Sequence, residues 1–198
     1  MPAFRKPTTN QIRRFQQRQS KSHLTYTDGG ATTLTPPAGF VVDRTRIQLG
    51  RGRAYFHAAK EALQNWRQFD LPWMEAAKPL PRIAVGENLV LSAYRLGLWW
   101  LNAVRIVDII DETTDACCRF GIVCGTLTDH VECGEERFLL EWNREDDNVW
   151  YDVLAFSRPQ HPLAYVGYPY VRRVQKSFAR ESAAALERHL SGQRTQTG

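Results

Sequence analysis

The residues best suited to chemistry lie in the stretch GTLTDHVECGEERFLLEW, residues 125–142, which holds His130, Cys133, Glu135 and Glu136. Imidazole, thiolate and carboxylate groups are all zinc ligands. The H-x2-C spacing lacks the second paired motif of a zinc site, so we predict no metal. The glycine patterns that bind nucleotide phosphates are also missing from the sequence, and we therefore predict no cofactor.

Glu136 is the best candidate for catalysis, because alternation along the following strand gives it an inward position. In EERFLLEW, every second residue from Glu136 to Trp142 shares one face of the extended chain. If this face lines an aromatic cavity, burial would raise the pKa of the Glu136 carboxyl and suit it to general acid–base catalysis. Tyr151 on the next strand and His130 in the turn are the candidate partners. The alternative is that these glutamates are rim charges, paired with basic side chains or with solvent.

Large aromatic side chains from several predicted elements could converge on one interior, where they either pack as core or line a ligand cavity. Trp99 and Trp100 point to opposite faces of an extended segment, so only one of them is expected inside. Both core packing and a ligand-lined cavity stay open. The side chains predicted to contact a ligand are Trp66, Trp100, Phe138, Trp142, Tyr151 and Phe178.

Hydrophobic periodicity predicts the elements that must position these residues. Residues 41–50 alternate as a first strand, and residues 54–68 carry a single apolar stripe typical of a helix. A long helix is expected to begin near Pro169 and to end at Gly192. Further strands are predicted at residues 84–94, 99–110, 117–127, 135–142 and 148–157.

This order of elements indicates the fold class. Strands followed by a helix, without βαβ alternation, indicate an α+β fold with an antiparallel sheet. A curved sheet that grips the long C-terminal helix would bury the apolar faces of both. Such an arrangement leaves a cavity between sheet and helix, which is the expected ligand site.

The chain is predicted to have a basic N-terminal helix and loop extension at residues 1–40, one domain at residues 41–191 and a tail at residues 192–198. Residues 1–53 hold ten Lys or Arg and two Asp, whereas residues 54–157 hold seventeen acidic and nine basic residues. The simplest interpretation is charge complementarity within one fold. The alternative is that the basic ends contact nucleic acid or an anionic membrane. RNA-binding motifs are missing from the sequence, which disfavours nucleic acid.

The sequence also predicts a cytoplasmic protein without a transmembrane segment. The first residues lack the apolar region of a signal peptide. The most apolar run, LGLWWLNAV, is too short to span a bilayer. The four cysteines are therefore expected to be reduced thiols.

Five separated motifs resemble a known family. They are LTYTDGGAT, LGRGRAYFHAAKEALQNWRQFDLPW, LGLWWLNAVRIVDIIDE, FGIVCGTLTDHVECGEERFLLEW and VWYDVLAFSRPQHPLAYVGYPYVRRVQKSFARES. In this order they resemble the DUF1990 family, also called UPF0548, from about residue 5 to about residue 185. The resemblance implies a single globular domain without an established activity. Its topology is similar to the helix-grip fold of the START/Bet v 1-like superfamily, whose members often bind hydrophobic ligands.

Three functions follow from these observations as hypotheses. The first is a module that binds a small hydrophobic or aromatic molecule, oriented by Glu136, Tyr151 and His130. The second is an enzyme on the same scaffold, a hydrolase, cyclase or isomerase in which Glu136 is the general acid or base. The third is a protein whose basic ends bind nucleic acid or an anionic membrane. The position of Glu136 relative to the cavity distinguishes the first two.

Overall fold

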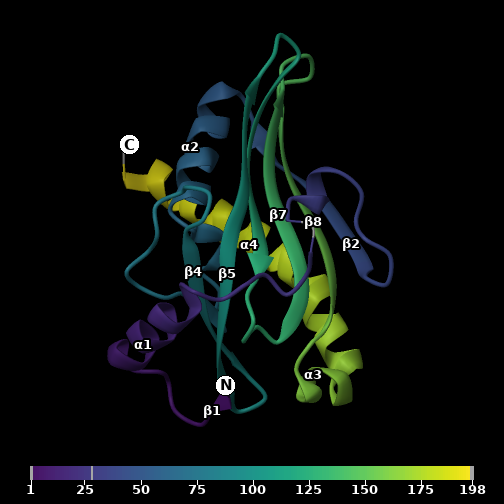
Figure 1. Cartoon of the computed structure of the whole chain (residues 1–198). Helices are drawn as coiled ribbons and strands as arrows, with labels where there is room; N and C mark the ends of the chain where they lie inside the picture. Colours follow the sequence, from purple (N-terminus) through teal and green to yellow (C-terminus); the bar gives the residue numbers. More distant parts are fainter. Residues whose placement is uncertain (1, 28, 197–198) are drawn as a thin grey trace.

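A curved antiparallel sheet surrounds one face of a long C-terminal helix in the computed structural model, which describes residues 2–27 and 29–196 (Figure 1). The strands follow the order β2-β8-β7-β6-β5-β4-β3, and β1 pairs with β5. The predicted α+β fold, with a curved sheet gripping the C-terminal helix, is confirmed. The strands are β1 (Pro2–Ala3), β2 (Val41–Arg51), β3 (Met74–Ala76), β4 (Asn88–Arg95), β5 (Leu98–Thr113), β6 (Cys117–Thr126), β7 (Glu132–Asn143) and β8 (Asn148–Pro159).

Two helices cover the concave face of the sheet and one covers its convex face. The long helix α4 crosses the concave face beside α2, whereas α1 lies against β4 and β5 on the other side (Figure 1). Short 3-10 turns, η1 and η2, join the larger elements. The helical elements are α1 (Thr9–Gln19), η1 (Ala31–Thr33), α2 (Arg53–Gln64), η2 (Arg67–Phe69), α3 (Pro162–Val166) and α4 (Tyr168–Gln196).

The boundaries of several elements differ from the sequence-based expectation for local reasons. β4 begins at Asn88 rather than at residue 84, because Gly86 adopts a left-handed turn with φ of 92°. The expected helix end at Gly192 is wrong, since α4 continues to Gln196. A glycine inside a helix costs only about 1 kcal/mol and does not by itself end one. Periodicity also missed the short elements β3 and α3.

The predicted extension at residues 1–40 packs onto the sheet. Thr8 caps α1 through a capping box with Gln11, and Phe15 is buried in a small cluster with Val90 and Leu127. This packing explains why β4 is apolar on both faces. The division at residue 40 stays a prediction. Asp28 of the predicted loop and residues 197–198 of the predicted tail lie outside the described residues.

Ion pairs join the basic N-terminal part to the acidic middle of the chain. Lys6 lies 2.7 Å from Glu75, and Arg18 lies 2.8 Å from Asp129. Exposed pairs of this kind each stabilise a fold by about 0–1 kcal/mol. The pairing favours charge complementarity within the fold as the explanation of the uneven charge. Across the described helices, none is both long and apolar enough to cross a membrane.

Candidate functional site

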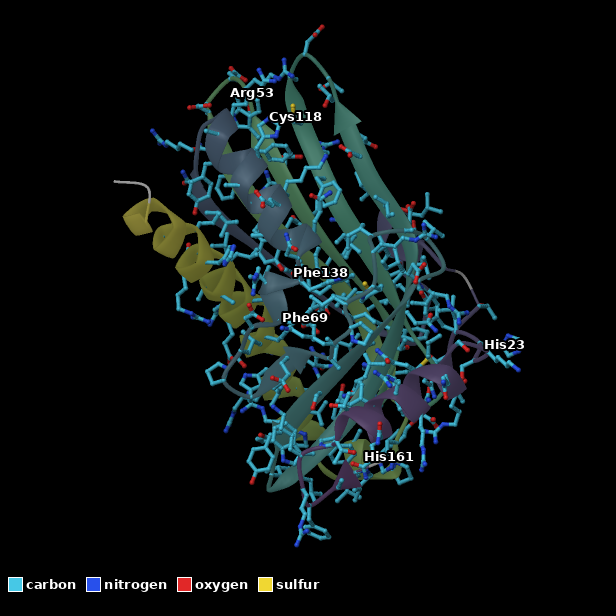
Figure 2. All side chains as sticks on the ribbon, turned by 90° about the vertical axis from the view of Figure 1, so that its left-hand side faces the viewer. His23, Arg53, Phe69, Cys118, Phe138 and His161 are labelled. Carbon is cyan, nitrogen blue, oxygen red and sulfur yellow. The ribbon has the colours of Figure 1, made fainter. Side chains whose placement is uncertain are left out.

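A cavity of about 730 Å³ lies between the concave face of the sheet and α4. Phe69 and Phe138 lie side by side in this interior, with ring centroids 5.4 Å apart (Figure 2). The first turns of α4 contribute Val171 and Val174 to its lining. Most of the lining is apolar, and it includes Phe69, Trp73, Leu91, Trp100, Val104, Phe138, Val153 and Phe178.

Glu136 faces this cavity, as strand alternation predicted. Its backbone pairs with Cys124 of β6 and Ala155 of β8, and all three residues line the space. Burial, and to a smaller extent the charge of Asp43, raises the pKa of the Glu136 carboxyl to about 8. The exposed part of the side chain faces the cavity and no described residue hydrogen-bonds to the carboxyl. It is therefore a protonatable group that is free to meet a ligand.

A polar cluster occupies another part of the cavity wall. Arg172 contacts Asp43 at 2.6 Å and donates a hydrogen bond of 2.6 Å to Gln175, which in turn donates to Ser157 at 2.8 Å. Burial raises the pKa of Glu132 to about 7, although Gln175, Arg172 and Ser157 lower it in part. The cluster joins α4 to β2, β7 and β8, so it sets the position of the helix over the cavity.

His130 also lines the cavity, from the turn between β6 and β7. Burial lowers the pKa of its imidazole to about 4, so the ring is neutral at neutral pH. Its Nδ1 lies 3.0 Å from both the backbone nitrogen and the backbone carbonyl oxygen of Glu132, so that end of the ring is held by β7. His130 can thus offer Nε2 to a ligand without carrying charge.

The predicted ligand-contact residues divide into two groups. Trp100, Phe138 and Phe178 line the cavity, together with the catalytic candidates Glu136 and His130. Phe138 and Phe178 also contact each other, with centroids 6.2 Å apart.

The other three predicted contacts, Trp66, Trp142 and Tyr151, lie outside the lining. Trp66 is 1% exposed and donates to the carbonyl of Pro81, whereas Trp142 donates to Asp147 near the far end of the sheet. Alternation correctly placed Trp142 and Tyr151 on the concave face. There, α2 and the second half of α4 fill the interior with side chains.

Tyr151 packs against α4, and its hydroxyl lies 3.3 Å from the Ser182 hydroxyl. We expect Tyr151→Phe to lower the free energy of unfolding by about 1 kcal/mol, because one buried hydrogen bond is lost. Ligand affinity should not change, since the hydroxyl does not reach the cavity. Chemical denaturation and a fluorescent-ligand titration measure the two quantities. A large loss of ligand affinity with unchanged stability would show instead that Tyr151 contacts the ligand.

Sequence reasoning missed several polar residues of the cavity, including Asp43, Asn102, Glu132 and Gln175. A signal for Glu132 was present. β7 begins at Glu132, three residues earlier than predicted, and even-numbered residues of this strand face inward. The same parity that identified Glu136 would have identified Glu132 if the strand had been extended.

Glu135 has the opposite role from its neighbour Glu136. Its side chain lies on the convex face and is 2% exposed. One carboxylate oxygen accepts from Tyr26 Oη at 2.5 Å and from Gly30 N at 2.6 Å. The other accepts from the backbone nitrogen of Thr32 at 2.7 Å and from its hydroxyl at 2.6 Å. Glu135 therefore anchors the loop before β2 to the back of the sheet.

The cysteines do not form a common site with His130. Cys124 is buried at the cavity, where burial raises the pKa of its thiol. Cys133 lies within β7 rather than at the hairpin tip, and its thiol donates to the carbonyl of Thr25 on the convex face. All four cysteines are free thiols, and the described residues contain no group of three or more side chains arranged to hold a metal ion.

Fold and site together define a helix-grip α+β protein, in which a curved antiparallel sheet and the C-terminal helix enclose a largely apolar cavity. Residues 25–185 match the family described as a domain of unknown function, DUF1990. A UPF0548 protein of Dictyostelium discoideum is 37% identical over 199 residues, which cover 92% of each chain. The UPF0548 protein At2g17695 of Arabidopsis thaliana is 33% identical over 156 residues, covering 77% of this chain and 75% of that one. The chain belongs to the DUF1990 (UPF0548) family.

Solved structures with a similar backbone include START proteins. Human STARD10 is 10% identical, with a TM-score of 0.49, over 96% of this chain and 84% of that one. A START superfamily protein from Mycobacterium smegmatis is 14% identical, with a TM-score of 0.48, over 77% of this chain and 97% of that one. Similarity at this level carries no information about ligand or reaction.

Proposed function

We propose that the protein binds a small hydrophobic or aromatic molecule in the cavity between the sheet and α4. The supporting observation is the cavity itself, about 730 Å³ with a mainly apolar lining. Small-molecule sites span about 300–1,000 Å³ and combine apolar walls with a few polar groups. Protein interiors are otherwise close-packed, with few voids larger than a water molecule. An unfilled space of this size is therefore better explained by an occupant than by imperfect packing.

The polar groups suit a ligand that is held at a few points. Glu136 and His130 offer one ionisable carboxyl and one neutral imidazole on the wall of the cavity. Phe138, Trp100 and Phe178 supply flat apolar surfaces around them. Such a wall can orient a molecule with an apolar body and at least one polar atom.

Filling the cavity tests this proposal. Ala155 pairs with Glu136 and lines the cavity, so Ala155→Trp places a large ring in the proposed binding space. Affinity for the neutral fluorophore N-phenyl-1-naphthylamine should fall at least about tenfold, equivalent to about 1.4 kcal/mol. Mass spectrometry of the purified protein should also show that any molecule bound to the wild type is lost from the variant.

Leu154→Trp is the matched control, because Leu154 precedes Ala155 on β8 and points to the opposite face of the sheet. This variant should keep both the fluorophore and any copurified molecule. Equal affinities of the two variants and the wild type would contradict binding in the cavity. Circular dichroism confirms that each variant is folded.

A second candidate function is catalysis by Glu136. The specific observation that favours it is a carboxyl whose pKa lies near 8 inside a ligand-sized cavity, which suits a general acid at neutral pH. Within the described chain, no second polar side chain hydrogen-bonds to Glu136, so a substrate would have to provide that contact. Recovery of the bound molecule unchanged after incubation favours binding. Its conversion by the wild type, but not by Glu136→Gln, favours an enzyme.

A further inference from the structure

Two carboxyl groups of β7 face the cavity with unused hydrogen-bonding capacity. Glu132 and Glu136 lie four residues apart on the same side of the strand, with Gly134 between them. Glu132 is 8% exposed, and its Oε1 has no hydrogen-bond partner among the residues that the structure describes. Glu136 has neither a hydrogen bond nor an ion pair within residues 2–27 and 29–196. Glu136 therefore lacks what a buried carboxylate needs, which is a donor or a positive charge, and Glu132 has it only in part, through Gln175, Ser157 and Arg172.

Among the described residues, no arginine forms an ion pair with either glutamate, because each arginine contacts another group, although the charge of Arg172 lowers the pKa of Glu132. Arg172 holds Asp43 through two contacts, of 2.6 and 2.7 Å. Arg44 lies 2.7 Å from Asp152. Arg95 lies 3.7 Å above a tryptophan ring.

The remaining basic groups of the lining do not supply it either. Lys176 and Arg180 are exposed on α4, where water solvates their charges. His130 is neutral, since burial lowers its pKa to about 4. The β7 part of the cavity wall thus presents two carboxyl groups that form no ion pair with a described residue.

We propose that the cavity selects a cationic amphiphile, whose apolar or aromatic body fills the space and whose protonated amine binds Glu136, with Glu132 as the second acceptor. This inference rests on the proposed ligand-binding function and names the chemical class of its ligand. An ammonium group brings a positive charge and several N–H donors, which are the two things that Glu136 lacks.

The alternatives fit the same wall less well. A ligand that ends in a carboxylate could bind only while Glu136 and Glu132 stay protonated, because like charges at close range repel. A ligand that ends in a hydroxyl could form one hydrogen bond with either carboxyl but would bring no charge to pair with its ionised form. Charge-assisted hydrogen bonds are also about twice as strong as neutral ones. The amine therefore gives the strongest discrimination among ligands with the same apolar body.

A pair of matched fluorescent probes tests the proposal. Dansylcadaverine carries a dansyl ring and an alkyl chain that ends in a primary amine, and N-pentyl dansylamide ends in a methyl group instead. In titrations of the full chain at neutral pH, we expect the amine probe to bind at least about tenfold more tightly. Glu136→Gln should remove most of this preference and leave the affinity of the methyl probe within about twofold. Glu132→Gln should reduce the preference by a smaller factor.

Both glutamine variants keep the shape of the side chain, and circular dichroism checks their folding. Tighter binding of the methyl probe, equal affinity for both probes, or an amine preference that survives both substitutions would overturn the inference and leave the proposed binding function intact. A carboxylate-ended dansyl probe that binds more tightly than the amine would do the same. Failure of every probe to bind would overturn the proposed function as well.

Discussion

Glu135→Ala should lower the free energy of unfolding by about 4 kcal/mol, the largest effect that we expect from a single substitution. The carboxylate accepts four hydrogen bonds from Tyr26, Gly30 and Thr32. A buried donor that loses its acceptor costs about 1–3 kcal/mol, and two of these donors are backbone N–H groups that cannot turn away easily. The segment around η1 should then detach from the convex face. Urea denaturation followed by tryptophan fluorescence measures the change.

Glu145→Ala is the matched control, since Glu145 is an exposed glutamate in the turn after β7. Its substitution should change stability by less than about 0.5 kcal/mol. Tyr26→Phe removes one of the four hydrogen bonds and should cost about 1 kcal/mol. If Glu135→Ala costs no more than Tyr26→Phe, the carboxylate does not anchor the loop.

Glu136→Gln should stabilise the protein, and the gain should grow as the pH rises. Burial raises the pKa of Glu136 from its ordinary value of 4.5 to about 8. In the unfolded chain the carboxyl loses its proton near pH 4.5, whereas the folded protein keeps it until about pH 8. The folded state thus holds more protons between these values, so its stability falls as the pH rises through this window. Glutamine does not ionise, so the variant does not lose stability in this way.

The expected gain is about 3 kcal/mol above the folded-state pKa, allowing for some hydration of the cavity. For a chain of this size, it corresponds to a melting temperature about 6 °C higher than that of the wild type. Below about pH 4.5 the wild type and the Glu136→Gln variant should have the same melting temperature. Glu132 is present in both proteins, so its own titration cancels in the comparison. Differential scanning calorimetry of both proteins across this pH range measures the melting temperatures.

Glu145→Gln serves as the control, because this side chain is exposed and its substitution should leave the melting temperature close to that of the wild type. A Glu136→Gln protein with the same pH profile as the wild type would show that the carboxyl is well solvated. The general-acid candidate would then lose its support, whereas binding in the cavity would not depend on the outcome.

Periodicity in the sequence predicted most of the fold because the core is built from amphipathic elements. Phe56, Ala59, Leu63 and Trp66 recur with helical spacing, and all four are buried in the structure. Alternation in β7 separated Glu135 from Glu136 correctly, since adjacent residues of a strand point to opposite faces. Short elements such as β3 contain too few residues to show a period, so the sequence alone did not reveal them.

The candidate site was less predictable, because a cavity depends on how elements pack. Phe138 and Trp142 share one face of β7, yet only Phe138 lines the cavity. Trp142 lies under α2, where Phe56 occupies the interior with a ring centroid 6.4 Å away. The extent of the space along the sheet is set by the positions of α2 and α4, which strand alternation does not specify.

The sequence by itself determined which side of each strand faces inward, because that depends on a local period of two residues. It also determined the family, through five motifs that occur in one order. Only the tertiary structure decided that Glu136 faces open space while Glu135 is held by four donors. The two side chains are chemically identical and adjacent, so their different roles come from the distant segments that fold against each face of the sheet.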